Sequence, residues 1–217
     1  MKVRHPPGRA GRPWLAHRLE VARRGAELLG EKQRALLRER ARLEPLVAQA
    51  RSDWEQRARE AERWLARAAM LGGERQLNYA PATLAQLTVG WRTILGVRCP
   101  ADPQLKLPPE RGLVRAGATA AVYSAATAHQ RALEAAVNVG VVERALELIE
   151  RDLRATTLRR VAIERRWIPA HERALAALEL SLDEVEREDS ARVHRILGSD
   201  GSGVARANHR PGTGGGG

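Results

Sequence analysis

The side chains that most often carry chemistry are few in this sequence and lie far apart. None of the six histidines has a histidine four residues away or an HExxH context, so they do not form a recognised zinc pattern. These histidines are His5, His17, His129, His171, His194 and His209. The single cysteine, Cys99, excludes an internal disulfide, a zinc ribbon and a dithiol redox motif. We expect Cys99 to be a small buried strand residue rather than a nucleophile.

Phosphate-binding and acid–base motifs are also missing from the sequence. No glycine-rich loop ends in Lys-Ser or Lys-Thr, and the terminal Gly-Thr-Gly-Gly-Gly-Gly has no lysine and no helix after it. The many Glu and Arg residues have the i,i+4 spacing of ion pairs on solvated helix faces. We therefore predict no catalytic residue, no metal ligand and no cofactor site, and a protein that is not itself an enzyme.

The composition favours long helices in thin layers. Of 217 residues, 43% are hydrophobic and 29% are charged, but only 3% are aromatic and Phe is absent. A thick globular core normally uses Phe and Tyr for bulk, whereas Leu, Ala, Arg and Glu are typical of long helices. A GC-rich genome also favours Ala and Arg codons, but codon bias does not remove Phe from a core.

The formal charge of +11 indicates surroundings that accept positive charge, such as nucleic acid, an anionic membrane surface or an acidic protein cavity. Nearly all the cations are arginines, which suit protein interfaces. They alternate with Glu along the chain, and the tryptophans are widely spaced, which argues against nucleic acid. No apolar run could span a bilayer and no signal core is present, so we expect a cytoplasmic chain without direct membrane insertion.

The first half of the sequence predicts a flexible basic arm over residues 1–12 and one long helix over residues 13–72. Apolar residues recur in steps of three and four, as in a coiled coil. This seam comprises Leu15, Leu19, Ala22, Ala26, Leu29, Gln33, Leu36, Arg40, Leu43, Val47, Ala50 and Trp54 and, after a stutter, Ala58, Ala61, Leu65 and Ala68. We expect Pro45 to kink this helix.

Residues 73–123 predict a small insert with a β-hairpin. Residues 87–99 alternate in polarity, which indicates a strand interrupted at Gly90 and Gly96. A loop is expected at the prolines that follow, Pro100, Pro103, Pro108 and Pro109. Residues 113–122 could form the second strand.

A second long helix is predicted over residues 124–197, with hydroxyl caps near Ser124 and a kink at Pro169. Its seam comprises Val142, Leu146, Ile149, Leu153, Thr156, Arg160, Ile163 and Trp167 and, after a stutter, Leu175, Leu178, Leu182, Val185, Asp189, Arg192 and Ile196. We expect Gly198 to end the helix, and residues 198–217 to form a disordered Gly-rich tail.

Two seams joined by a compact insert can satisfy each other within one chain. The predicted fold class is therefore mainly α, a long antiparallel two-helix coiled coil with the hairpin-containing insert at the end opposite the termini. The alternative is that each seam pairs with a second copy of the chain.

Several short segments resemble the D subunit of the V-type and archaeal-type rotary ATPases. The stretch RLEVARRGAELLGEKQRAL, residues 18–36, follows the family pattern R-L-x-x-A-x-x-G-x-x-L-L-x-x-K-R-x-x-L, with Gln33 in place of the second basic residue. The run RRVAIERRWIP, residues 159–169, is similar to R-R-V-N-A-L-E followed by I-P but lacks the N-A-L-E portion. GVRCP, residues 96–100, and the last charged turns, residues 182–196, are also similar to the family.

The resemblance implies a noncatalytic central rotor shaft that transmits torque during coupled ion transport. It implies contacts with the A and B subunits of the catalytic hexamer, with the F subunit and with the subunit that caps the membrane rotor ring. It also implies a peripheral position on the cytoplasmic face of the cell membrane. The alternative function is a coiled-coil adaptor or a basic scaffold that binds nucleic acid.

Overall fold

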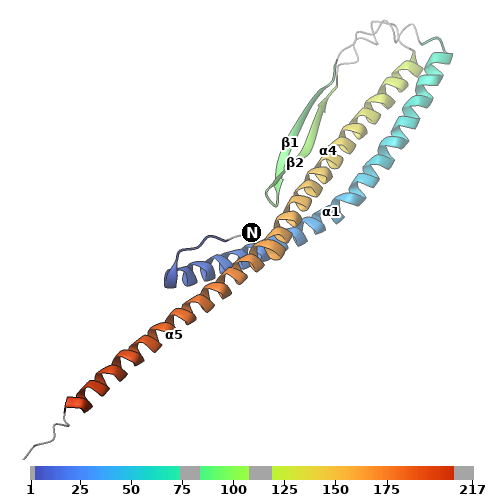
Figure 1. The fold of residues 1–217 in the computed structure, drawn as a ribbon. Helices are drawn as coiled ribbons and strands as arrows, with labels where there is room; N and C mark the ends of the chain where they lie inside the picture. The colour runs from blue at the N-terminus through green and yellow to red at the C-terminus, as the bar shows by residue number, and fades with distance from the viewer. Residues whose placement is uncertain (1–2, 74–83, 108–118, 208–217) are drawn as a thin grey trace, which may run out of the picture. The chain divides into compact units, whose positions relative to one another are not determined.

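The computed structural model describes residues 3–73, 84–107 and 119–207, with side chains described as far as residue 195 in the last range (Figure 1). Helix α1, Gly11–Met70, follows a short 3-10 turn at Gly8–Ala10 and is joined by the strands β1 and β2 to a second long helical segment. The mainly helical fold with a small antiparallel hairpin is the fold class that the sequence predicts.

Helix α1 contains 60 residues and stays helical through Pro45. A proline inside a helix removes one backbone hydrogen bond and costs about 3 kcal/mol. The buried side chains of Leu36, Leu43 and Ala50 hold the helix against its partner on both sides of Pro45 and offset that cost. Pro45 therefore does not break the helix, and the kink remains a prediction.

The first seam is confirmed by burial. Its buried members are Leu15, Leu19, Ala26, Leu36, Leu43, Ala50, Ala61 and Ala68. Trp54 and Leu65 differ, because they are 40% and 38% exposed. The remaining seam positions of α1 are half-buried. The three-and-four periodicity thus identifies the face of α1 that packs against other parts of the chain.

The second helical segment comprises α4, Ala120–Ala162, a π turn at Ile163–Trp167, and α5, Ile168–Ala207. The amide of Tyr123 donates to the carbonyl of Thr119 at 3.1 Å, so the helix begins before the predicted caps near Ser124. The prediction that Gly198 ends the helix is wrong, because α5 continues to Ala207. A glycine inside a helix lowers helix stability by only about 1 kcal/mol relative to alanine, so a glycine such as Gly198 does not have to end the helix. Gly72 takes the left-handed φ of 78° where α1 ends.

The π turn ends at Trp167, two residues before Pro169. Pro169 has no N–H to donate to the carbonyl of Arg165, and a π turn accommodates one extra residue. The predicted seam steps by eight residues from Trp167 to Leu175, one more than a heptad. The stutter in the sequence therefore has a counterpart in the backbone, and α4 and α5 follow one another without a loop.

Strands β1, Gln86–Ile94, and β2, Val97–Lys106, form an antiparallel pair. They are joined by a two-residue turn in which Leu95 and Gly96 have φ of 52° and 83°. Positive φ at both residues is the type I′ geometry that matches the twist of a hairpin. The predicted interruption at Gly96 is therefore the turn itself. The interruption at Gly90 is a register shift next to Val89.

Two expectations about the insert are wrong. Pro100 and Pro103 lie within β2 rather than in a loop, which is possible because each strand of a two-stranded sheet is an edge. The partner of β1 is β2 and not residues 113–122, since Ala120 already begins α4. Pro108, Pro109 and residues 113–118 lie outside the described residues.

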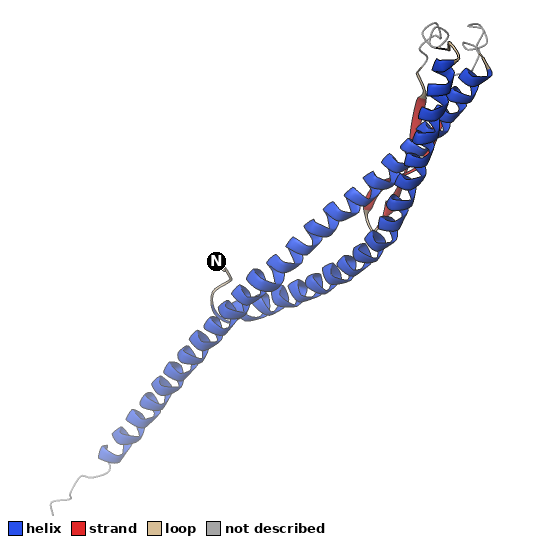
Figure 2. Ribbon diagram, turned by 90° about the vertical axis from the view of Figure 1, so that its right-hand side faces the viewer, coloured by secondary structure: helices blue, strands red, loops and turns tan. Residues whose placement is uncertain are grey.

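The chain divides into two compact units, of which the larger comprises residues 28–160. In this unit α1 and α4 run side by side, and the hairpin lies along them (Figure 2). The insert leaves at one end of the pair, where Ala68, Val122 and Ala125 form a small core with Trp64. The hairpin runs back from this end, so that Cys99 packs in a second core with Leu36, Leu43, Ala145 and Ile149.

The smaller unit comprises residues 1–27 and 161–217. Its buried side chains are Leu15, Leu19 and Ala26 of α1 and Ala170, His171 and Leu178 of α5. Beyond Leu182 the described residues of the predicted seam are exposed to solvent. Val185 is 51% exposed, and Asp189 and Arg192 are also exposed.

Candidate functional site

Two of the described histidines, His129 and His171, donate to the backbone carbonyl four residues earlier in the chain. The Nδ1–H of His171 donates to the carbonyl of Trp167 at 2.9 Å, and that of His129 to the carbonyl of Ala125 at 2.8 Å. The His171 ring also stacks on the Trp167 ring, with centroids 3.4 Å apart. Within the described residues no three His, Cys, Asp or Glu side chains gather where a metal ion could bind.

His171 is a packing residue that the sequence analysis missed. It is only 4% exposed. Two successive steps of four, from Trp167 to His171 and from His171 to Leu175, would have placed it on the buried face. Its polarity concealed it, because the seam was traced mainly through apolar residues.

Cys99 is buried and free, as the sequence suggested for a small strand residue. Burial raises the pKa of its thiol, more than the nearby Arg92 lowers it. A thiol with a raised pKa in an apolar core is a poor nucleophile. Cys99 therefore attaches the hairpin to the helices through packing.

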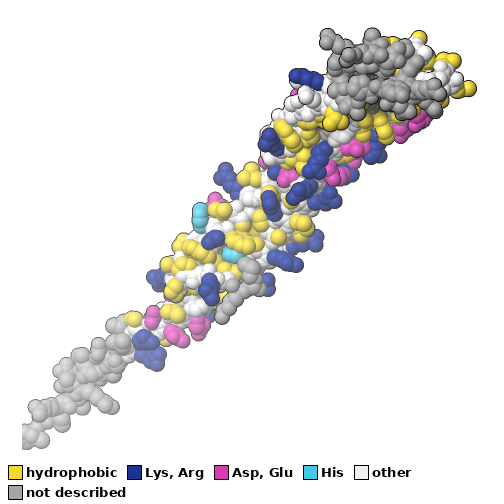
Figure 3. Space-filling model, turned by 90° about the horizontal axis from the view of Figure 1, so that it is seen from above, with side chains coloured by type: hydrophobic (Ala, Val, Ile, Leu, Met, Phe, Trp, Pro, Cys, Tyr) yellow, Lys and Arg dark blue, Asp and Glu magenta, His cyan; other side chains and the backbone are white. Residues whose placement is uncertain are grey.

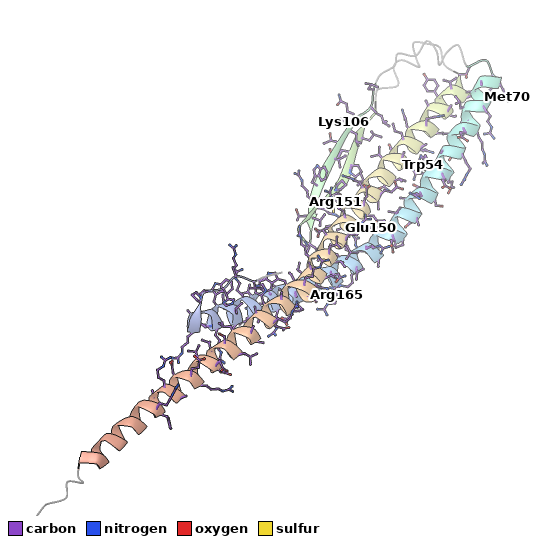
Figure 4. The ribbon with its side chains drawn as sticks, in the orientation of Figure 1. Trp54, Met70, Lys106, Glu150, Arg151 and Arg165 are labelled. Atoms are coloured by element: carbon purple, nitrogen blue, oxygen red, sulfur yellow. The ribbon has the colours of Figure 1, made fainter. Side chains whose placement is uncertain are left out.

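A series of ion pairs joins α1 to the returning helices. In the smaller unit the guanidinium of Arg23 lies 2.7 Å from Glu172, and Arg12 lies 3.1 Å from Glu179. In the larger unit Lys32 pairs with Asp152 at 2.8 Å, Arg40 with Glu150 at 3.2 Å, and Arg51 with Glu143. Figure 4 labels Glu150 on α4. Each pair takes its cation from α1 and its carboxylate from α4 or α5.

This division of charge fits antiparallel pairing of α1 with α4 and α5. If two copies of α1 packed against each other in parallel and in register, each of these α1 cations would face the same cation of the other copy, which is unfavourable. The exposed pairs contribute little stability individually, but they act together on register. Gln33 adds an uncharged polar contact between the same helices, since its amide donates to the Thr157 hydroxyl at 2.9 Å. The intramolecular coiled coil is thus specified by polar contacts as well as by apolar burial.

Glu39 of α1 is a carboxylate whose ionised form is favoured by Arg42 of the same helix and by Arg92 of the hairpin. The Nε and Nη2 groups of Arg42 donate to the two carboxylate oxygens of Glu39, at 3.0 and 2.7 Å. The Arg42 hydrogen bond lowers the pKa of Glu39 against the opposing effect of burial, and the hairpin residue Arg92 lowers the pKa further. A carboxyl held ionised in this way is suited to structure and not to acid catalysis.

Charged and apolar side chains are interspersed on the outer surface, as Figure 3 shows for one face. In the larger unit Met70, at the end of α1, is 86% exposed (Figure 4). In the smaller unit Leu180 and Val193 of α5 are 72% and 52% exposed. Each unit therefore has large apolar side chains available for contact with other proteins. The arrangement offers binding surfaces and a helical support.

A sequence model of the family of ATP synthase D subunits matches residues 14–198. The chain belongs to this family. It is 31% identical over 188 residues to the D subunit of the A-type ATP synthase of Pyrococcus horikoshii, covering 84% of this chain and 88% of the relative. It is 32% identical to the Pyrococcus furiosus protein of the same name over the same shares of the two chains. The D subunit of the V-type ATP synthase of an Anaeromyxobacter species is 31% identical over 200 residues, or 89% of this chain and 93% of the relative.

Membership of the D-subunit family agrees with the resemblance found in the short sequence segments. The match begins at Trp14, next to the predicted helix start, and ends at Gly198. It includes both seams and the hairpin. Within the described part of the chain, no helix is long and apolar enough to cross a membrane.

Proposed function

We propose that the chain is the noncatalytic central shaft of a rotary A/V-type ATP synthase or ATPase, and that it carries torque between the A/B hexamer and the membrane rotor ring. The observation that carries the proposal is the antiparallel helix pair, buried along its seam and joined by ion pairs such as Arg23–Glu172 and Lys32–Asp152. Membership of the D-subunit family supports it.

The mechanism requires a support that resists twist. Two helices that share a buried seam deform together, whereas a lone helix has no neighbour to oppose its rotation. Buried Leu36, Leu43 and Ile149 supply this coupling in the larger unit, and Leu19 and Leu178 are buried in the smaller one. On rotation, the shaft would present a different face to each A/B pair and so bias its nucleotide site between open and closed states.

The proposed partners are the A and B subunits, the F subunit and the subunit that caps the membrane ring. The exposed apolar residues Leu180 and Val193 on α5, and Met70 at the end of α1, are suitable contacts for such partners. The chain would then lie peripherally on the cytoplasmic side of the membrane, held there by other subunits.

Reconstitution tests the proposal. The purified chain should hydrolyse no ATP, and it should restore coupled ATPase activity when it is added to an A/B hexamer and membrane sector that lack it. Failure to bind the hexamer, together with salt-sensitive retention on DNA, would favour the scaffold function instead. ATP hydrolysis by the isolated chain would contradict the noncatalytic role.

A further inference from the structure

A shallow groove separates α1 from the tip of the hairpin in the larger unit. Its volume is about 660 Å³, and we call it the tip groove. It is lined by Leu28, Glu31, Lys32, Arg34, Ala35 and Arg38 of α1 and by Leu95 of the turn. Three features of these residues are unfavourable for the isolated chain, and each favours a bound partner.

The first feature is the residue at the tip. Leu95 has φ of 52°, a left-handed conformation that a leucine rarely takes and that Asn or Gly adopts with less strain. Its side chain is also 43% exposed, so packing within the described chain does not explain the choice. A strained backbone that presents a leucine to solvent indicates that the leucine contacts something else.

The second feature is a pair of like charges. Arg34 and Arg38 are exposed and four residues apart on α1, where they repel each other. The structure records no ion pair for either one within the described chain, whereas the neighbouring Lys32 is held by Asp152 at 2.8 Å. Glu31 is the one carboxylate among the lining residues. The lining of the groove is therefore net positive and suited to carboxylates.

The third feature is the apolar part of the groove lining. Leu28 is 58% exposed, and Ala35 follows it one heptad later on the same face of α1. With Leu95 opposite, these residues offer apolar contacts along one helix and at one point across from it. This spacing is that of a surface for a helix with apolar residues at i, i+3, i+4 and i+7.

We infer that the tip groove docks an acidic amphipathic helix of a partner protein. The leucines would contact its apolar face, and Arg34 and Arg38 would pair with the carboxylates beside that face. A nucleic acid would use the arginines but would gain little from Leu28 and Leu95. The inference concerns this surface alone and does not depend on the torque-carrying role.

Fluorescence anisotropy with a labelled synthetic peptide tests the inference on the full chain. The probe is a helix of about 18 residues with leucines at i, i+3, i+4 and i+7 and glutamates beside them. We expect it to bind at least about tenfold more tightly than a scrambled peptide of equal composition. Leu95→Asn, which suits the turn, and the double variant Arg34→Glu/Arg38→Glu should each weaken binding about tenfold.

The matched control carries the same kinds of change elsewhere on the larger unit. Arg154 and Leu158 are exposed residues four apart on α4, so Arg154→Glu/Leu158→Ser should leave peptide binding unchanged. Circular dichroism confirms that each variant keeps its helix content. Equal binding of the scrambled peptide, or wild-type binding by Leu95→Asn, would overturn the inference. Duplex DNA that displaces the peptide from the groove at lower concentration would overturn it in favour of a nucleic-acid site.

Discussion

Lys32 of α1 lies 2.8 Å from the carboxylate of Asp152 on α4, measured from Nζ to Oδ2. Their side chains are 34% and 26% exposed, against 59% and 46% for Arg23 and Glu172. The strength of an ion pair rises as water is excluded from it. The Lys32–Asp152 pair should therefore contribute more than its exposed counterpart to holding the two helices in register.

A double-mutant cycle with Lys32→Ala and Asp152→Ala should give a coupling free energy of about 0.5–1 kcal/mol, measured by urea unfolding. The same cycle at Arg23 and Glu172 should give less than about 0.5 kcal/mol, because those side chains are more exposed. Adding about 1 M salt should reduce both values. Equal coupling at the two sites would show that exposure does not set their strength.

Ile149→Ala should lower the free energy of unfolding by about 2–4 kcal/mol, because Ile149 of α4 is fully buried in the core that α4 forms with α1 and the hairpin. Leu158→Ala is the control on the same helix, since Leu158 is 71% exposed and its truncation should cost less than about 0.5 kcal/mol. Urea unfolding followed by circular dichroism measures both. A similar loss in the two variants would contradict the position of the core.

The helices were predictable because leucines mark their seams. Leu36, Leu43 and Ile149 recur at coiled-coil spacing, and burial confirms all three. The first half of α4 was harder to trace, because its buried residues include Ala128 and Ala135, whose small side chains give a weak periodic signal. Alanine seams are recognised once the partner helix is seen.

The hairpin was harder to predict because two local rules conflicted with the tertiary structure. Pro100 and Pro103 normally indicate a loop, yet both lie in an edge strand. Leu95 is an unusual residue for a positive-φ turn, so the Leu95–Gly96 turn carried no Asn-Gly signal. The net positive charge of the chain could be predicted from composition. The tip groove required coordinates, because Leu28 and Leu95 are 67 positions apart in the chain.

Gly73→Ala should destabilise the chain by about 1–3 kcal/mol. A Cβ at Gly73 would lie 2.7 Å from both the Ala68 carbonyl oxygen and the Val122 Cγ2, where α1 ends beside α4. Gly25→Ala, within α1, is the control, since a Cβ there meets nothing within 4 Å. It should instead stabilise the helix by up to about 1 kcal/mol. Thermal unfolding distinguishes the two, and a neutral Gly73→Ala would contradict the close approach.

The pH dependence of stability should carry a contribution from Glu39. Its pKa in the folded chain lies below the ordinary 4.5, chiefly because Arg42 donates to it. A depressed pKa means that the stabilisation is present above the unfolded value and is lost as the pH falls through the folded one. The free energy of unfolding of wild type relative to Glu39→Gln should therefore be constant above about pH 5.5 and shrink below pH 4.5. A difference that does not change with acidification would contradict the lowered pKa.

The rate at which Cys99 reacts with a thiol reagent should report how firmly the hairpin is attached. Cys99 is 0% exposed, so it reacts only when the hairpin leaves the helices or the chain unfolds. The native protein should react at least about 100-fold more slowly than the urea-unfolded chain. Ile94→Ala, which removes an inward contact of the same core, should speed the native reaction about tenfold. Thr93→Ala, on the exposed face of β1, should not change it. If both variants react at the wild-type rate, opening does not involve the hairpin, and its packing against α1 and α4 is not what protects the thiol.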